Sequence, residues 1–198
     1  MRSLPQSPSA ERNKGPILEL LARHLPVSGQ VLEIGSGTGQ HVIHFAIACP
    51  DQGWQPSERI EELPVLRQRL AMEAPANVGP ALELDVSRQP WPVAEAALVI
   101  SINTAHIMSW PAVCAMFEGV GQLLENGAEF LLYGPFMHRG RHNAESNAEF
   151  DRQLKARSPE MGLRDIRELE ILAARSGMSL VSRHPMPANN RILVFRKD

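Results

Sequence analysis

The sequence predicts an α/β fold in which helices cover both faces of a mostly parallel, seven-stranded sheet that ends in an antiparallel hairpin. Two observations lead to this prediction. Short apolar segments of strand character alternate with segments of helical periodicity along one chain of 198 residues. Only the last two strand-like segments are joined by a tight turn, Pro187-Ala-Asn-Asn190. The alternating order favours parallel pairing, because a crossover helix returns the chain to the starting edge of the sheet.

The expected elements follow from apolar spacing and turn residues. Strands are expected at 31–34, 53–57, 81–84, 97–102, 129–133, 179–183 and 191–195. Helices are expected from Pro16, where apolar side chains first recur on one face, and at 40–48, 60–73, 111–124 and 165–176. The preceding segment, Arg2 to Asn13, is expected to be irregular. The strand at 53–57 is placed by topology, because Pro56 lowers its β-propensity.

Composition favours a globular protein with one domain over residues 1–198, since 43% of the residues are hydrophobic and 21% are charged. The net charge of −2 gives no general attraction to nucleic acid or to anionic membranes. Two cysteines form neither a disulfide framework nor a zinc site by themselves. No apolar run resembles a signal peptide or a bilayer span, so we expect a cytoplasmic protein that does not act on membranes or nucleic acid.

A glycine-rich turn, Glu33-Ile-Gly35-Ser36-Gly37-Thr38-Gly39, lies between an expected strand and an expected helix. Glycines there allow a sharp turn and close approach of a ligand. The pattern G-x-G-x-G after an acidic residue resembles motif I of class I methyltransferases, whereas a dinucleotide site has G-x-G-x-x-G. The carboxylate of Glu33 suits a cationic amino-acid group better than a pyrophosphate, which disfavours an NAD-dependent oxidoreductase.

Two more acidic residues follow expected strands. Glu58 ends the second strand, where an acid can accept hydrogen bonds from ribose hydroxyls, although Ser57 or Glu61 could be in register instead. Asp85, followed by Val86, ends the third strand. Ligands of open α/β sheets bind at the carboxyl ends of the strands, so three such acids together predict a binding site there.

Longer phrases resemble a family of small methyltransferase-like proteins, long catalogued as a domain of unknown function. The phrases are Ser7 to Leu18, Val31 to His41, Trp54 to Ser57, Leu132 to Phe136, Ser146-Asn147 with Phe150-Asp151, Gly162 to Asp165, and Met186 to Asn190. The resemblance implies a Rossmann-like class I methyltransferase fold that binds S-adenosylmethionine, and it implies no particular substrate. The chain has Glu58 where the family usually has Asp, and Thr104 where it usually has Met.

Residues of the expected cofactor site come from the glycine turn, the strand ends and the amino-terminal segment. They are Glu33, Gly35, Ser36, Gly37, Thr38, Gly39, Glu58, Asp85, Val86, Asn103, Arg12 and Asn13. In the amino-terminal segment, residues 1–15, the polar run from Glu11 to Lys14 ordinarily indicates a solvated helix entry. The resemblance favours a lid there, with Arg12 or Asn13 folded over the cofactor.

The methyl acceptor is expected beyond the fourth strand, near His106, which we interpret as a general base because histidine titrates near neutral pH. A histidine that only shapes the loop is an equal alternative. Tyr133 ends the fifth strand on the same edge, and Met108 and Trp110 could line the pocket or cap the next helix. The insertion at 138–159 is expected as a specificity loop over the site. Its substrate-side candidates, which could equally be solvated, are Arg141, Asn143, Asn147 and Asp151.

Metal binding is disfavoured, because His41 and His44 lack a third ligand of obvious spacing. The sequence therefore predicts an S-adenosylmethionine-dependent methyltransferase acting on a small molecule. The alternative is a non-catalytic protein that binds adenosylmethionine or adenosylhomocysteine as a sensor or as a partner of another enzyme. Neither the acceptor nor the oligomeric state follows from the sequence.

Overall fold

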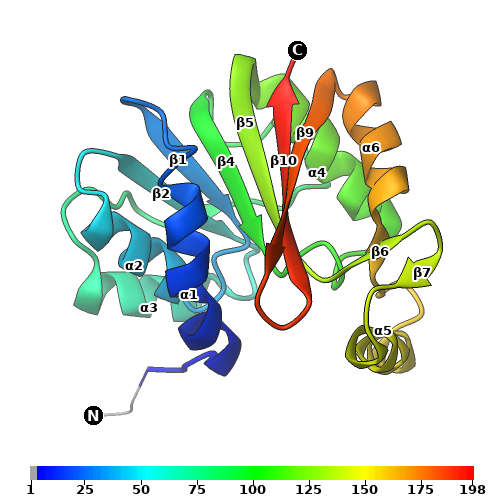
Figure 1. Cartoon of the computed structure of the whole chain (residues 1–198). Helices are drawn as coiled ribbons and strands as arrows, with labels where there is room; N and C mark the ends of the chain where they lie inside the picture. The colour runs from blue at the N-terminus through cyan, green and yellow to red at the C-terminus, as the bar shows by residue number, and fades with distance from the viewer. Residues whose placement is uncertain (1–3) are drawn as a thin grey trace. The chain divides into compact units, whose positions relative to one another are not determined.

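A computed structural model describes residues 4–198 (Figure 1). Its seven-stranded sheet has the order β3-β2-β1-β4-β5-β10-β9, and a second sheet has the order β7-β6-β8. β1 pairs in parallel with β2, and β2 with β3, whereas β10 is antiparallel to both β5 and β9. The expected α/β fold, mostly parallel with an antiparallel carboxyl-terminal hairpin, is confirmed.

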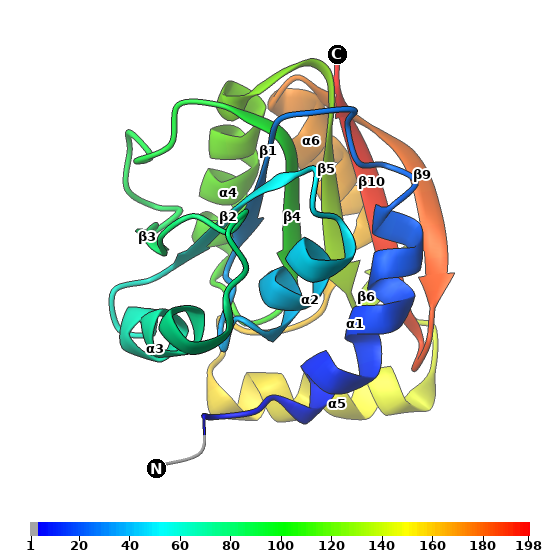
Figure 2. The ribbon, with the colours of Figure 1, turned by 90° about the vertical axis from the view of Figure 1, so that its left-hand side faces the viewer.

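The chain divides into two compact units, with the boundary between Ile100 and Ser101. The expectation of a single domain stays a prediction. The first unit holds α1 (Pro8–Leu21), β1 (Gln30–Ile34), α2 (Gln40–Ala48), β2 (Gly53–Glu58), α3 (Leu63–Glu73), β3 (Leu82–Glu83) and most of β4 (Ala96–Ile102). α1 packs against α2, and the two helices lie side by side in both views (Figures 1 and 2).

The second unit holds α4 (Trp110–Leu123), β5 (Leu124–Gly134), β6 (Phe136–His138), β7 (Arg141–His142), α5 (Glu145–Arg157), β8 (Arg164–Asp165), α6 (Ile166–Arg175), β9 (Met178–Met186) and β10 (Asn190–Lys197). Its core forms where α4 meets the sheet strands. The ring of Phe117 contacts the rings of Phe130 and Phe195 edge-on, at centroid distances of 5.4 and 5.1 Å. α6 packs against α4 and β9.

The irregular conformation expected for the amino-terminal segment is wrong from Pro8 onward, and residues 1–3 lie outside the described residues. Ser7 is an N-cap whose side chain accepts a hydrogen bond from the Ala10 amide, and Pro8 occupies the first turn. Pro16, expected as the helix start, lies inside α1. The helix therefore begins eight residues earlier, at a serine–proline pair that apolar spacing does not reveal.

The expectation of a loop at 138–159 is also wrong, because these residues contain a β-hairpin and α5. The buried side chains of α5 are Asn147, Asp151 and Leu154, spaced four and three residues apart. This is the spacing of one helical face, but two of its three members are polar. Hydrophobic periodicity therefore gave no sign of the helix.

Candidate functional site

The glycine turn follows β1 and precedes α2, as expected. Gly35, Gly37 and Gly39 have φ values of 75°, 54° and 77°, in the left-handed region that disfavours residues with a Cβ. The amides of Gly35 and Ser36 both donate to the Ser57 carbonyl, at 3.1 and 2.9 Å. These bonds fix the turn against the end of β2.

The glycines of this turn have different surroundings. A Cβ added at Gly39 would lie 3.0 Å from Leu66 Cδ1 and 3.3 Å from Arg69 Cδ, both on α3. A Cβ at Gly37 would meet no described atom within 4 Å. Gly39 is thus required for packing, whereas the space beside Gly37 is open to a ligand.

Glu33 provides a buried carboxyl next to this turn, with one oxygen that has no partner among residues 4–198. Its side chain is only 1% exposed, and Oε2 has no hydrogen-bond partner among the described residues. Burial, opposed by a hydrogen bond with Ser36 and assisted by the nearby Glu58, raises the pKa of Glu33 to about 7. A buried carboxyl of this kind gains most from a cationic partner, since a cation would stabilise its ionised form.

Glu58 ends β2 and faces the glycine turn. Its Oε2 accepts a hydrogen bond from the Gly37 amide at 2.8 Å, and Oε1 accepts one from the Arg59 amide at 2.8 Å. The alternatives are used elsewhere: the buried Ser57 hydroxyl donates to the Glu33 carbonyl, and Glu61 pairs with Arg59 on the surface. Glu58 is therefore the acid that reaches the turn.

Asp85 follows β3 in a less buried setting. Its Oδ1 accepts a hydrogen bond from the Ser87 amide at 3.0 Å, and Oδ2 lies 3.5 Å from the exposed Arg88. The neighbouring Val86 is buried. Asp85 thus caps a turn and keeps a partly exposed carboxylate.

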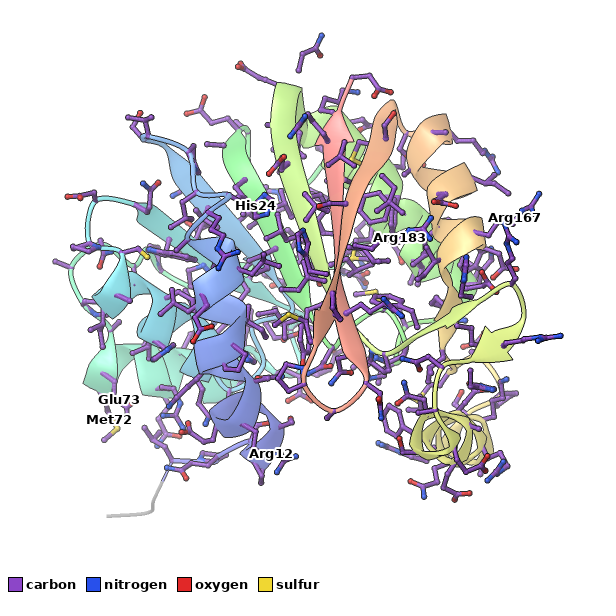
Figure 3. All side chains as sticks on the ribbon, viewed as in Figure 1. Arg12, His24, Met72, Glu73, Arg167 and Arg183 are labelled. Carbon is purple, nitrogen blue, oxygen red and sulfur yellow. The ribbon has the colours of Figure 1, made fainter. Side chains whose placement is uncertain are left out.

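α1 contacts the start of α2 through polar side chains. Gln40 accepts hydrogen bonds from the Ser7 amide (2.6 Å) and the Thr38 hydroxyl (2.8 Å), and it donates to Glu11. The buried Asn13 bonds to Nε2 of His41 at 2.7 Å. Arg12, expected beside Asn13 over the cofactor, is exposed on α1 (Figure 3). Asn13 thus anchors α1 to α2.

In the second unit, His106 lies in the turn after β4. Asn103 begins this turn with a φ of 59°, and its amide donates to the Tyr133 carbonyl at 2.9 Å. The His106 ring is 7% exposed and makes an edge contact with Phe150 of α5, at a centroid distance of 5.3 Å. Burial and, to a smaller extent, the charge of Arg164 lower the pKa of His106 to about 4. The expected titration near neutral pH is wrong, because the protonated ring would be desolvated.

The remaining acceptor-side candidates differ in exposure. Tyr133 is buried at the end of β5. Met108 and Trp110 are half-buried, and the Trp110 ring lies 5.8 Å from the Arg164 guanidinium. Trp110 begins α4, whose N-cap Ser109 accepts a hydrogen bond from the Ala112 amide. These contacts fit the expected helix cap and leave a pocket role open.

The polar residues near α5 form internal hydrogen bonds. Asn143 and Asn147 both donate to the Asn189 carbonyl in the turn between β9 and β10, at 2.9 and 3.1 Å. Asp151 accepts from the Leu163 amide (2.8 Å) and pairs with Lys155 and His142. Burial opposes ionisation of Asp151, but these three partners hold its pKa below the usual value. Arg141 is exposed on β7.

Sequence reasoning missed one functional candidate of the second unit, Arg164. It belongs to the phrase Gly162-Leu-Arg-Asp165, which carries the family resemblance but gave no role to any residue. Its guanidinium donates to the carbonyls of Ala105, Met108 and Glu160. Such contacts to backbone carbonyls have no sequence signature.

Neither a metal centre nor a membrane span is found in residues 4–198. These residues contain no group of three or more His, Cys, Asp or Glu side chains placed to hold a metal ion. None of the helices over the same residues has the length and apolar character required to cross a bilayer.

Comparisons with solved structures give the same fold. The chain is similar to mitomycin 7-O-methyltransferase, with 16% identity, a TM-score of 0.80, and coverage of 96% of this chain and 54% of that one. It is similar to human N-acetylserotonin methyltransferase in complex with S-adenosylmethionine, with 15% identity, a TM-score of 0.81, and coverage of 96% of this chain and 52% of that one. It also resembles an O-methyltransferase family protein from Burkholderia thailandensis, with 13% identity, a TM-score of 0.81, and coverage of 96% of this chain and 57% of that one. The chain spans about half the length of these proteins, and the likeness shows the fold.

A family model described as "Protein of unknown function (DUF938)" matches residues 4–197, nearly the whole chain.

Proposed function

The chain belongs to the DUF938 family, and we propose that it is an S-adenosylmethionine-dependent methyltransferase acting on a small molecule. The observation that carries the proposal is the buried Glu33 carboxyl, whose Oε2 has no partner among residues 4–198 and which adjoins a glycine turn with open space at Gly37. This arrangement suits a ligand that brings both a cation and close backbone approach. It disfavours a dinucleotide, because the pyrophosphate would meet a carboxylate.

The residues present fit the groups of adenosylmethionine. Glu33 would hold the ammonium group, Glu58 the ribose hydroxyls, and Asp85 with Val86 the adenine. Thr38 is a further candidate for the amino-acid end. When bound, this cofactor supplies a methyl group activated by a sulfonium. The protein aligns the acceptor and excludes water, and it needs a base only where the acceptor arrives protonated.

His106 is the proposed general base on the acceptor side. Its pKa of about 4 leaves the imidazole unprotonated at neutral pH, so a lone pair is free to accept a proton from a hydroxyl, amine or thiol, although as a weaker base than an ordinary histidine. Tyr133, Met108 and Trp110 are proposed to line the acceptor site. The names of two similar proteins, mitomycin 7-O-methyltransferase and N-acetylserotonin methyltransferase, support an acceptor of small size.

Calorimetric titration with adenosylmethionine, adenosylhomocysteine and NAD tests the cofactor assignment. We expect the first two to bind at micromolar levels and NAD not to bind, and preferential NAD binding would overturn the proposal. A panel of small phenols, amines, thiols and carboxylic acids, assayed for adenosylhomocysteine release, then tests catalysis. Tight cofactor binding without turnover on any acceptor would favour the non-catalytic sensor.

A further inference from the structure

The side chain of Arg164, on β8, contacts three backbone carbonyls. Its Nε donates to the Ala105 carbonyl at 3.0 Å, and its Nη2 donates to the carbonyls of Met108 and Glu160. The first two carbonyls flank His106 in the turn after β4. The amide of Gly162, two residues before Arg164, donates to the His106 carbonyl itself at 2.9 Å. The segment 105–108 is thus held at the carbonyls of residues 105, 106 and 108 by one short stretch of chain.

That stretch is itself anchored by buried carboxylates on either side of Arg164. Asp151 of α5 accepts a hydrogen bond from the Leu163 amide at 2.8 Å. Asp165 accepts one from the Gly140 amide at 2.6 Å and caps α6 through the Arg167 amide at 2.9 Å. The guanidinium therefore extends from a backbone that cannot shift without breaking these bonds.

Among residues 4–198, the guanidinium of Arg164 forms no ion pair. Asp151 pairs with His142 and Lys155 instead. Glu168 and Asp151 act on the charge of Arg164 only at longer range. A guanidinium that donates in several fixed directions to carbonyls orients a segment more strictly than an ammonium would. Its contact with the Trp110 ring adds a further restraint.

We propose that Arg164 is a positioning residue for methyl transfer, which fixes the segment 105–108 and with it the ring of His106. This role rests on the proposed methyltransferase function. Around the ring lie Phe150 of α5 and Gly134 of β5, which carry no charge. Arg164 is the charged group that affects His106. Arg164 thus sets both the place of the imidazole and its electrostatic surroundings.

Three variants separate charge from geometry. Arg164→Gln removes both the positive charge and the guanidinium fork, whereas Arg164→Lys keeps only the charge. Arg167→Gln is the matched control, because Arg167 is an exposed arginine on the neighbouring α6 (Figure 3). The readouts are the NMR titration of the His106 ring, assigned with His106→Asn, and hydrogen exchange of the amides at 105–110.

In Arg164→Gln, we expect the titration midpoint of His106 to rise above about 4 but to stay below that of a free histidine, because burial, the larger cause of the low pKa, remains. Exchange at 105–110 should accelerate by about tenfold or more. In Arg164→Lys, the midpoint should stay low while exchange still accelerates. Methyl transfer to an acceptor found in the panel should slow by about 10- to 100-fold in both variants, the usual effect of a misplaced group.

A midpoint and exchange rates in Arg164→Gln equal to those of Arg167→Gln would overturn the proposal. If Arg164→Gln does not fold, the test rests on Arg164→Lys. Hydrogen exchange at 105–110 as slow in Arg164→Lys as in the wild type would then overturn the proposal. Global unfolding of both variants would overturn it too, since Arg164 would then support the whole unit. Adenosylhomocysteine binding to the wild type is measured separately, and failure there contradicts the proposed function without affecting the His106 titration.

Discussion

Each of the two compact units buries a carboxyl group, but the two groups differ in their hydrogen-bond partners and in the direction of their pKa shifts. In the first, Glu33 is buried with Oε2 unpaired, and its pKa is raised to about 7. In the second, Asp151 is almost as buried, but Lys155, Leu163 and His142 hold its pKa below the usual value. A carboxyl that is satisfied internally supports architecture, whereas one left unsatisfied is available to a ligand. Glu33 and Asp151, both in segments that carry the family resemblance, thus differ in whether a ligand could still satisfy them.

The largest effect is expected at His106, where the second unit would contribute chemistry as well as architecture. His106→Ala should lower turnover by about 10²- to 10⁴-fold, the usual contribution of a positioned base. Adenosylhomocysteine release measures this, and calorimetry should show cofactor affinity nearly unchanged. Because the base is active only when unprotonated, wild-type turnover should fall as the pH drops through about 4, and the variant should lack this limb. Unaltered turnover in His106→Ala would restrict the second unit to architecture.

The next largest effect is expected at Glu33 in the first unit, whose Oε2 has no partner among residues 4–198. Glu33→Ala should weaken adenosylmethionine binding by about 1.5–3 kcal/mol, or about 10- to 150-fold, if it removes a charge-assisted hydrogen bond. Thermal unfolding serves as a folding control, and little loss of stability is expected because Oε2 makes no hydrogen bond within residues 4–198.

Asp85→Ala is the matched comparison, and its cost should be smaller because adenine offers a neutral amine and Asp85 is partly exposed. Equal and unchanged affinities in the two folded variants would reduce the glycine turn to a structural element.

A smaller effect separates two glycines of the same turn. Gly39→Ala should destabilise the fold by about 1–2 kcal/mol from left-handed strain alone, with a further cost from contact with Leu66 and Arg69. Gly37→Ala should cost only the strain, since its Cβ meets open space. For each kcal/mol of lost stability, however, Gly37→Ala should lose more adenosylmethionine affinity than Gly39→Ala does. Denaturant unfolding measures the lost stability, and calorimetry measures the lost affinity. The same ratio of lost affinity to lost stability in both variants would contradict a ligand beside Gly37.

The sequence predicts the first unit better than the second. The glycine turn, its flanking strand and helix, and Glu58 at the end of β2 lie where spacing and turn chemistry place them. α5 was missed because Asn147 and Asp151 take core positions that hydrophobic periodicity assigns to apolar residues. The start of α1 was missed because a capping serine, not an apolar repeat, defines it. The neutral state of His106 and the contacts of Arg164 depend on burial and on backbone carbonyls, which local sequence does not encode.

The central claim, that Glu33 receives the cationic end of adenosylmethionine, is tested most directly by proton release on binding. The pKa of free Glu33 is about 7, so at pH 6 the carboxyl is mostly protonated, and binding a cation to its ionised form must release about one proton. Calorimetry at pH 6 in two buffers of different ionisation enthalpy measures this release. We expect about one proton per adenosylmethionine in the wild type, none in Glu33→Gln, and an affinity that rises with pH and levels off above about 7. Tight binding at pH 6 without proton release in the wild type would contradict the account.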